Sequence, residues 1–118
     1  GFQAFVPRAF HNANNRLRKL NAPTGADDLK NLAIGRLLLD NIPHIKAYWP
    51  MHTPQLAQVA LTMGVDDVDG TVVEEHIYHM AGAETEQAMS VEELVSMIRL
   101  AGRTPVERDA LYQTVREY

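Results

Sequence analysis

The residues best suited to chemistry lie in one segment, Thr71–Gly82, with the sequence TVVEEHIYHMAG. Its β-branched start predicts a buried strand, which ends at Glu74 and Glu75 and is followed by His76 and His79. Acids and imidazoles at the carboxyl end of a strand are typical of the active face of α/β enzymes. A strand that has simply reached solvent is the alternative, because strand ends are commonly polar.

Glu74 and His79 are the candidate catalytic residues of this segment. Adjacent side chains point to opposite sides of a strand, so only one of Glu74 and Glu75 can face an active-site opening. We expect Glu74 to accept a proton or bind ribose hydroxyls and Glu75 to bind substrate, with a salt bridge or a helix cap as the alternative for either. His79 could contact substrate or transfer a proton. The H-x-x-H spacing of His76 and His79 lacks a partner helix motif, so we predict no metal site.

Further candidates for substrate binding lie near two earlier predicted strands. Lys46 and Tyr48 share one face of the strand His44–Trp49, where a cation could meet a carboxylate and a phenol could hydrogen-bond. The alternative for Lys46 is an ion pair with an acid. His52 precedes a predicted helix, whose N-terminus favours neutral imidazole. Arg8, just past the first strand, could clamp a carboxylate.

Strands and helices alternate along the chain in the expected elements. Hydrophobic periodicity and Pro or Gly breakers predict strands over Phe2–Val6, His44–Trp49 and Val68–Val73. The same signals predict helices over Asp27–Asp40, 54–63 and 91–101, and a last helix that starts at Thr104. Strands that alternate with amphipathic helices indicate parallel pairing through right-handed crossovers.

Local signals place the ends of these helices. Thr53 is the expected N-cap before Pro54, and Ser90 forms a capping box with Glu93. A second box, Thr104 with Glu107, predicts the start of the last helix, with Leu111 and Val115 facing the core. The first long helix has a wide apolar face, made of Leu29, Leu32, Ala33, Ile34, Leu37 and Leu38.

The third predicted strand carries two further signals. Gly70 inside it suggests close approach of another backbone or of a ligand. Asp66, Asp67 and Asp69 lie before this strand or early in it. In a TIM-type barrel the amino ends of the strands serve stability and not catalysis, so we expect these acids to be solvated or to cap a helix.

The fold class expected is α/β, with three consecutive βα units of a TIM-type barrel and a parallel sheet. Three strands and four helices cannot close a barrel, so the first and third strands would expose their edges. We therefore expect residues 1–118 to form a single partial-barrel fragment of a larger protein, as the start at Gly1 inside a strand also suggests. Its edges would be covered by the rest of the barrel or by a second copy, and a homo-oligomer is expected.

Composition excludes several classes. The formal net charge of −4, with scattered Lys and Arg, does not support nucleic-acid binding. No apolar run approaches a membrane span and nothing resembles a secretory signal, so a soluble cytoplasmic protein is expected. The chain has no cysteine, which excludes disulfides, cysteine nucleophiles and a cysteine-ligated iron–sulfur cluster within it.

Long stretches resemble the C-terminal part of the aminofutalosine synthase family, radical S-adenosylmethionine enzymes of the futalosine route to menaquinone. The resemblance is carried by GFQAFVPRAFH, by IPHIKAYWPMHTPQLAQVALTMGVDDVDGTVVEEHIYHMAGA and by AGRTPVERDALY. Two related families share the plan, cyclic dehypoxanthine futalosine synthase and the deazaflavin-precursor synthase. The segments HIKAYW and DGTVVEE…HMAGA are more similar to aminofutalosine synthase than to either relative.

The resemblance implies that the full-length enzyme is about three times as long as this chain and has a TIM-type barrel fold. Such an enzyme cleaves S-adenosylmethionine with a [4Fe-4S] cluster, whose C-x-x-x-C-x-x-C ligands are absent here, and adds the 5′-deoxyadenosyl radical to 3-[(1-carboxyvinyl)oxy]benzoate. In that setting Gln3 and Phe5 would line the adenosyl pocket, and the isolated chain would be inactive. A self-associating module and a hydrolytic or lyase barrel that uses Glu74 with His79 are the alternatives.

Overall fold

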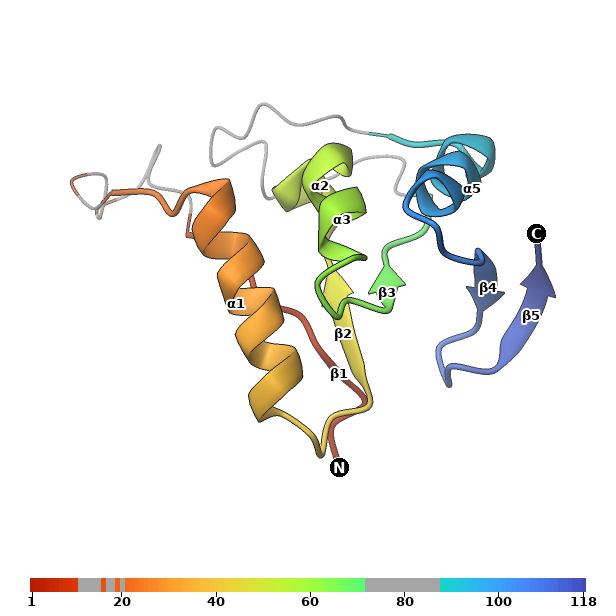
Figure 1. The fold of residues 1–118 in the computed structure, drawn as a ribbon, viewed down its shortest axis with the longest axis horizontal. Helices are drawn as coiled ribbons and strands as arrows, with labels where there is room; N and C mark the ends of the chain where they lie inside the picture. The colour runs from red at the N-terminus through yellow and green to blue at the C-terminus, as the bar shows by residue number, and fades with distance from the viewer. Residues whose placement is uncertain (11–15, 17–18, 20, 72–87) are drawn as a thin grey trace.

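Three short parallel strands form the centre of the molecule (Figure 1). The structure, a computed structural model, describes residues 1–10, 16, 19, 21–71 and 88–118. The strands are β1 (Ala4–Phe5), β2 (His44–Ala47) and β3 (Asp67–Val68), in the order β1-β2-β3. Ala4 pairs with His44 and Lys46 with Asp67, both in parallel register. The prediction of a parallel sheet is confirmed.

Helix α1 (Gly25–Leu38) connects β1 to β2 and begins two residues before the predicted start. Thr24 caps it, because its hydroxyl accepts from the Asp27 amide while the Asp27 carboxylate accepts from the Thr24 amide. This hydrogen bonding lowers the pKa of Asp27. The predicted apolar face is wider than the buried one: Leu32 is fully buried, whereas Leu37 is 79% exposed and Ile34 and Leu38 are also exposed.

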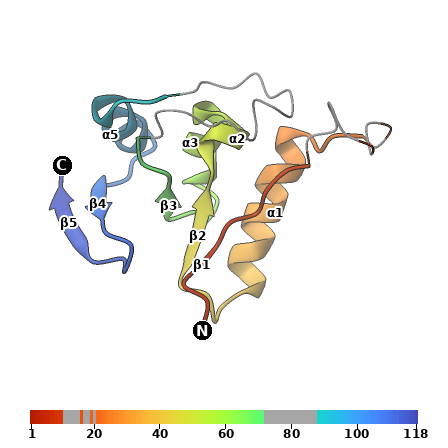
Figure 2. The same ribbon diagram turned by 180° about the vertical axis from the view of Figure 1, so that it is seen from behind.

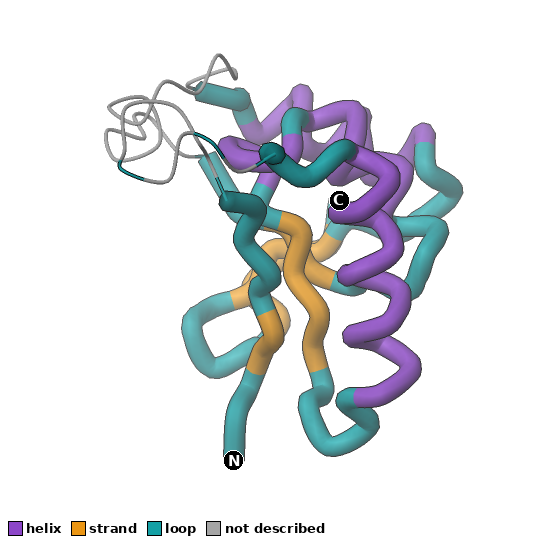
Figure 3. The backbone as a smooth tube through the Cα atoms, turned by 90° about the vertical axis from the view of Figure 1, so that its left-hand side faces the viewer, coloured by secondary structure: helices purple, strands orange, loops and turns teal. Residues whose placement is uncertain are grey.

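The core lies between the sheet and the helices on one of its faces (Figure 3). Ile45 and Ala47 of β2 point into it and are fully buried, as is Leu32 of α1. Phe5 packs against the same core and touches α1 so closely that a Cβ at Gly35 would lie 2.8 Å from its ring. The remaining core residues are Trp49, Ala57, Ala60, Leu61, Val65, Met89, Leu94 and Met97.

Two consecutive helices follow β2. Strand β2 ends at Ala47, two residues earlier than predicted, and Trp49–His52 forms the short helix α2. Pro50, which has no amide hydrogen to donate, is tolerated in the first turn of α2. Helix α3 (Pro54–Ala60) then begins where predicted, with the Thr53 hydroxyl accepting from the Leu56 amide. Helix α5 (Val91–Leu100) has the predicted Ser90–Glu93 capping box, whose hydrogen bonds lower the pKa of Glu93.

The prediction of a last helix from Thr104 is wrong. The chain forms an antiparallel hairpin instead, β4 (Val106–Arg108) and β5 (Thr114–Glu117), beyond β3 in Figure 2. The Asp109 carboxylate accepts from the amides of Leu111 and Gln113, and Tyr112 has a φ of 62°, so side-chain hydrogen bonds and a left-handed residue build a turn. Leu111 and Val115 are 68% and 61% exposed, not buried as expected.

The expected α/β class with a parallel sheet is confirmed, whereas the expectation that the sheet is part of a TIM-type barrel is not. Within the described ranges the three strands form an open sheet, not a closed barrel, and neither β1 nor β3 has a strand partner on its outer edge. Strand β3 covers Asp67–Val68, so Gly70 follows it instead of lying inside it, and residues 72–73 of the predicted strand are outside the described residues. A Cβ at Gly70 would meet nothing within 4 Å, so close approach of a described atom does not explain this glycine.

Candidate functional site

Arg8 and Tyr48 meet beyond the carboxyl ends of β1 and β2. The Arg8 guanidinium lies over the Tyr48 ring, 4.6 Å from its centroid, in a cation–π contact. Tyr48 and Met51 are buried together, with Val6 and Ala9 packed against them. A guanidinium held against an aromatic ring keeps its charge and its hydrogen-bond donors, so Arg8 can bind an anionic group.

His52 ends α2 and lies almost completely inside the protein, with 5% of its surface exposed. Its Nδ1 is one of two buried side-chain atoms without a hydrogen-bond partner among the described residues. Burial lowers the pKa of His52 to about 4. The imidazole is therefore neutral at neutral pH, as the sequence predicted, but burial is the cause.

Asp69 and Lys46 form an ion pair at the carboxyl ends of β3 and β2. Lys46 Nζ donates to Asp69 Oδ1 over 3.2 Å, while Asp69 Oδ2 is the other buried atom without a partner. Burial raises the pKa of Asp69, and the Lys46 charge opposes that rise. Trp49 fixes the backbone here, since its Nε1 donates to the carbonyls of Asp69 (3.1 Å) and Gly70 (3.2 Å).

Asp67 ties the hairpin to the parallel sheet. Its carboxylate accepts from Arg108 Nε (3.3 Å) and Nη2 (2.7 Å), and from the Tyr112 hydroxyl (2.8 Å). Lys46 Nζ lies 3.6 Å from Asp67 Oδ2. Burial and the hydrogen bond to Asp67 raise the pKa of Tyr112 to about 12. The expectation that Asp67 is solvated is wrong, because the carboxylate is buried under the hairpin.

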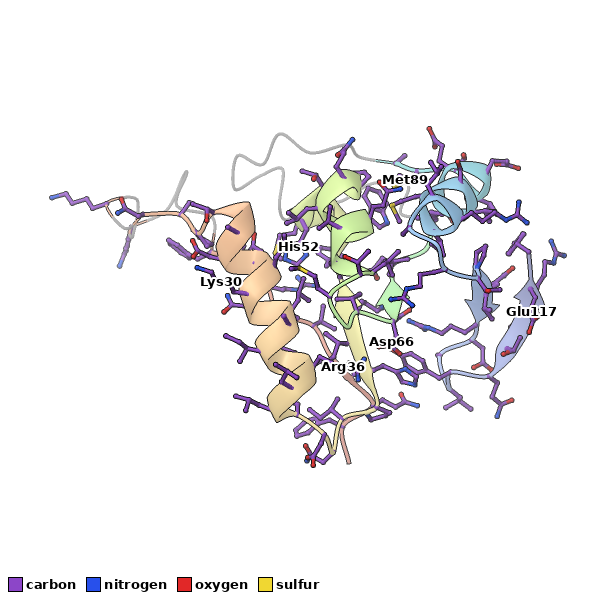
Figure 4. All side chains as sticks on the ribbon, viewed as in Figure 1. Lys30, Arg36, His52, Asp66, Met89 and Glu117 are labelled. Carbon is purple, nitrogen blue, oxygen red and sulfur yellow. The ribbon has the colours of Figure 1, made fainter. Side chains whose placement is uncertain are left out.

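A second set of contacts lies at the amino end of β2. The His44 and Tyr112 rings stack with centroids 3.7 Å apart, and His44 Nδ1 lies 2.6 Å from Asp66 Oδ2. Asp66 also accepts from Arg36 of α1, and these two residues lie side by side in Figure 4. Asp66 Oδ1 accepts from the Ile45 amide as well (2.8 Å), so the carboxylate joins α1 to β2.

The acids Asp66, Asp67 and Asp69 and their partners border a cleft of about 1070 Å³ between β2, β3, α5 and the hairpin. Lys46, Asp69, Gly70 and Thr71 line it near the carboxyl end of β3, and Arg108 and Tyr112 line it from the hairpin. The charges near Lys46 balance, because Lys46 and Arg108 face Asp67 and Asp69. Lys46 therefore brings no excess positive charge to the cleft, which matches the alternative in which it pairs with acids.

The structure groups the predicted site residues unevenly. It brings Arg8 and Tyr48 together, pairs Lys46 with two acids and buries His52. Gln3 is exposed, and the Phe5 ring contacts the helix layer at Gly35. Glu74, Glu75, His76 and His79 lie outside the described residues.

The residues that surround Lys46 in the cleft were not predicted as site residues: Asp67, Asp69, Arg108 and Tyr112. The three acids within four positions, Asp66, Asp67 and Asp69, were the available signal. The basic and aromatic side chains that hydrogen-bond to their carboxylates are between 22 and 45 residues away along the chain, so local spacing did not indicate the pairing.

No group of three or more metal-ligating side chains occurs in the described part of the chain. The 118-residue sequence has no cysteine, so this chain supplies no thiolate ligand for an iron–sulfur cluster. None of its described helices is both long and apolar enough to span a membrane.

Comparisons with known proteins give one family. The model of the CofH/MqnC C-terminal region matches residues 1–118. The chain is 56% identical over 98% of its length to the aminodeoxyfutalosine synthase of Thermus thermophilus, covering 32% of that protein. It is 43% identical to 5-amino-6-(D-ribitylamino)uracil–L-tyrosine 4-hydroxyphenyl transferase of Methanococcoides burtonii, over 98% of this chain and 35% of that one.

A third relative is the cyclic dehypoxanthine futalosine synthase of Halalkalibacterium halodurans, 33% identical over 99% of this chain and 31% of its own length. The chain therefore spans about a third of the length of the curated relatives it matches. All three are named as enzymes.

Proposed function

The chain belongs to the CofH/MqnC C-terminal family, and we propose that it is the C-terminal part of a radical S-adenosylmethionine enzyme that makes aminodeoxyfutalosine for menaquinone. The observation that carries this choice is the identity of 56% with a synthase of that name. Identity falls to 43% with the transferase from Methanococcoides burtonii and to 33% with the cyclic dehypoxanthine futalosine synthase. The reactions of these two relatives are the alternatives.

In the proposed reaction S-adenosylmethionine supplies the 5′-deoxyadenosyl group that is joined to 3-[(1-carboxyvinyl)oxy]benzoate. This chain would contribute to binding that acceptor, which carries two carboxylates. The Arg8 guanidinium, held on the Tyr48 ring, is suited to one carboxylate, since guanidinium and carboxylate pair through two parallel hydrogen bonds. Neutral His52 is suited to an uncharged polar group.

The [4Fe-4S] cluster would be held by residues outside this chain, which has no cysteine. Glu74 and His79 stay proposed as proton-transfer residues and Glu75 as a substrate ligand. We keep the proposal that Gln3 and Phe5 line the pocket of the adenosyl group. The contact of the Phe5 ring with α1 does not support this role for Phe5.

The test is product analysis by mass spectrometry. The complete protein, reconstituted with iron and sulfide and supplied with reductant, S-adenosylmethionine and the acceptor, should form aminodeoxyfutalosine. The 118-residue chain under the same conditions should form no 5′-deoxyadenosine. Product of either alternative reaction from the complete protein, or 5′-deoxyadenosine from the chain alone, would contradict the proposal.

A further inference from the structure

The Asp69–Lys46 pair has an unfilled hydrogen-bonding capacity at the edge of the cleft. Asp69 Oδ1 accepts from Lys46, whereas Oδ2 has no partner among the residues that the structure describes. An unpaired buried acceptor destabilises the folded state, so such an atom in a folded protein calls for an explanation. Asp67, by comparison, is occupied on both oxygens by Arg108 and on Oδ2 by Tyr112 as well.

Asp69 is placed to reach the cleft. Its side chain is 21% exposed and lines the cleft together with Lys46, Gly70 and Thr71. Oδ2 itself is buried, so the acceptor open to a ligand is Oδ1, which keeps a lone pair beside its hydrogen bond from Lys46. A Cβ at Gly70 would find no atom of the described residues within 4 Å, which leaves room beside the pair in this part of the chain.

The backbone at this point is held firmly. The fully buried Trp49 donates its indole N–H to the carbonyls of Asp69 and Gly70. A rigid support of this kind keeps a binding group in place before the ligand arrives, which lowers the entropic cost of binding.

The pair presents an acceptor and a donor side by side, 3.2 Å apart. A hydroxyl group is the complementary partner, because it donates one hydrogen bond and accepts others. Charged ligand groups are disfavoured, since the two cations, Lys46 and Arg108, already balance the carboxylates of Asp67 and Asp69. An uncharged, hydroxyl-bearing ring fits this environment.

We propose that Asp69 and Lys46 form a subsite for sugar hydroxyls, with Asp69 accepting and Lys46 donating. The assignment rests on the proposed function for its particular ligand, the ribose of a nucleoside, and it adds to that function the residues that hold the sugar. Neither residue was assigned to sugar binding by the sequence.

Isothermal titration calorimetry of the complete protein tests the subsite with two probes, adenosine and 2′,3′-dideoxyadenosine. The unmodified protein should bind adenosine about tenfold more tightly than 2′,3′-dideoxyadenosine, because only adenosine has ribose hydroxyls that can donate hydrogen bonds to the charged acceptor. Asp69→Asn should reduce this ratio of the two affinities to about twofold or less. An asparagine side chain has one oxygen, and that oxygen already accepts the hydrogen bond from Lys46. Asp40→Asn, which removes an exposed carboxylate of the same size, should leave the ratio unchanged.

Asp69→Ala is the second variant, and circular dichroism confirms that each variant folds. The subsite is overturned if the unmodified protein binds the two probes equally or does not bind adenosine. It is also overturned if a folded Asp69 variant keeps the affinity ratio of the unmodified protein. If product forms but the ratio is insensitive to Asp69, the subsite alone fails. If the ratio depends on Asp69 but no aminodeoxyfutalosine forms, the proposed reaction alone fails.

Discussion

Arg8 and Tyr48 are single residues whose contact crosses from the segment after β1 to the end of β2. The ring supports the guanidinium at 4.6 Å without neutralising it, so the positive charge stays available to a ligand. This differs from Lys46, whose charge is taken up by Asp67 and Asp69.

Arg8→Met in the complete protein should raise the KM for the dicarboxylate acceptor about tenfold or more, because a charge-assisted hydrogen bond is lost. Steady-state kinetics measure the effect. Arg116→Met is the matched control, since Arg116 also lies over a tyrosine ring, that of Tyr118 at 5.6 Å, but on the exposed hairpin. Equal effects of the two substitutions would contradict a specific role for Arg8.

His52 should titrate far below an ordinary histidine, because burial lowers its pKa in the folded protein from the usual 6.5 to about 4. The unfolded chain takes up its proton first, so His52 contributes stability above pH 6.5 that is lost as the pH falls toward 4. The NMR chemical shift of the His52 Cε1 proton should stay at its neutral position at pH 5.5. His52→Gln should flatten the stability profile over this window, and an unshifted titration midpoint would contradict burial of the neutral ring.

At the scale of elements, the contact between β1 and α1 depends on a glycine. Phe5 of β1 occupies the space that a side chain at Gly35 would need. Alanine is the better helix former by about 1 kcal/mol, but a buried clash costs about 1–3 kcal/mol. Since the ring belongs to a well-packed core, we expect the clash to dominate.

Gly35→Ala should therefore lower the free energy of unfolding by about 1–2 kcal/mol in urea titrations. Asn31→Ala, on the exposed side of the same helix, should be neutral or slightly stabilising. Adding Phe5→Leu to Gly35→Ala should relieve part of the loss. A gain in stability from Gly35→Ala alone would contradict the observed packing.

At the scale of the whole molecule, the hairpin is attached to the parallel sheet by a small set of contacts between residues that are far apart along the chain. Asp67 accepts from Arg108 and Tyr112, 41 and 45 residues away, and Tyr112 stacks on His44. Arg103 adds a hydrogen bond to the Leu61 carbonyl. Removal of the Asp67 charge leaves Arg108 poorly paired, so local opening of the hairpin becomes easier.

Asp67→Asn should increase amide hydrogen exchange in β4 and β5 about tenfold or more and leave α1 nearly unchanged. Mass spectrometry of peptides resolves the two regions. Glu107→Gln, which weakens only the exposed contact with the Tyr118 hydroxyl, should have little effect. Uniform exchange changes across the chain would mean that the hairpin is not a separate unit of opening.

The open edges of β1 and β3 also concern the whole molecule, and we propose that the rest of a barrel or a second copy covers them. Size-exclusion chromatography with light scattering should find the 118-residue chain as an oligomer, because unpaired edges favour association. The complete protein, by this proposal, fills its edges internally. A folded monomer of the short chain at low concentration would contradict edge-driven association.

The sequence alone determined the features that depend on neighbours along the chain. Alternating polarity marked β2, the Ser90–Glu93 pair marked the start of α5, and proline marked the start of α3. The site prediction in the TVVEEHIYHMAG segment lies outside the described residues, which include only its first residue, Thr71. Motif resemblance indicated the family, because it extends over most of the chain.

Only the tertiary structure decided what distant groups do. Thr104 and Glu107 satisfy a helix-capping pattern, yet Arg108 and Tyr112 reach Asp67 only if the chain folds as a hairpin, and these long-range contacts outweigh a local signal. Asp69 and Lys46 are 23 positions apart, and parallel pairing of β2 with β3 makes them neighbours. Pairing energy depends on distance in space, which spacing along the chain does not specify.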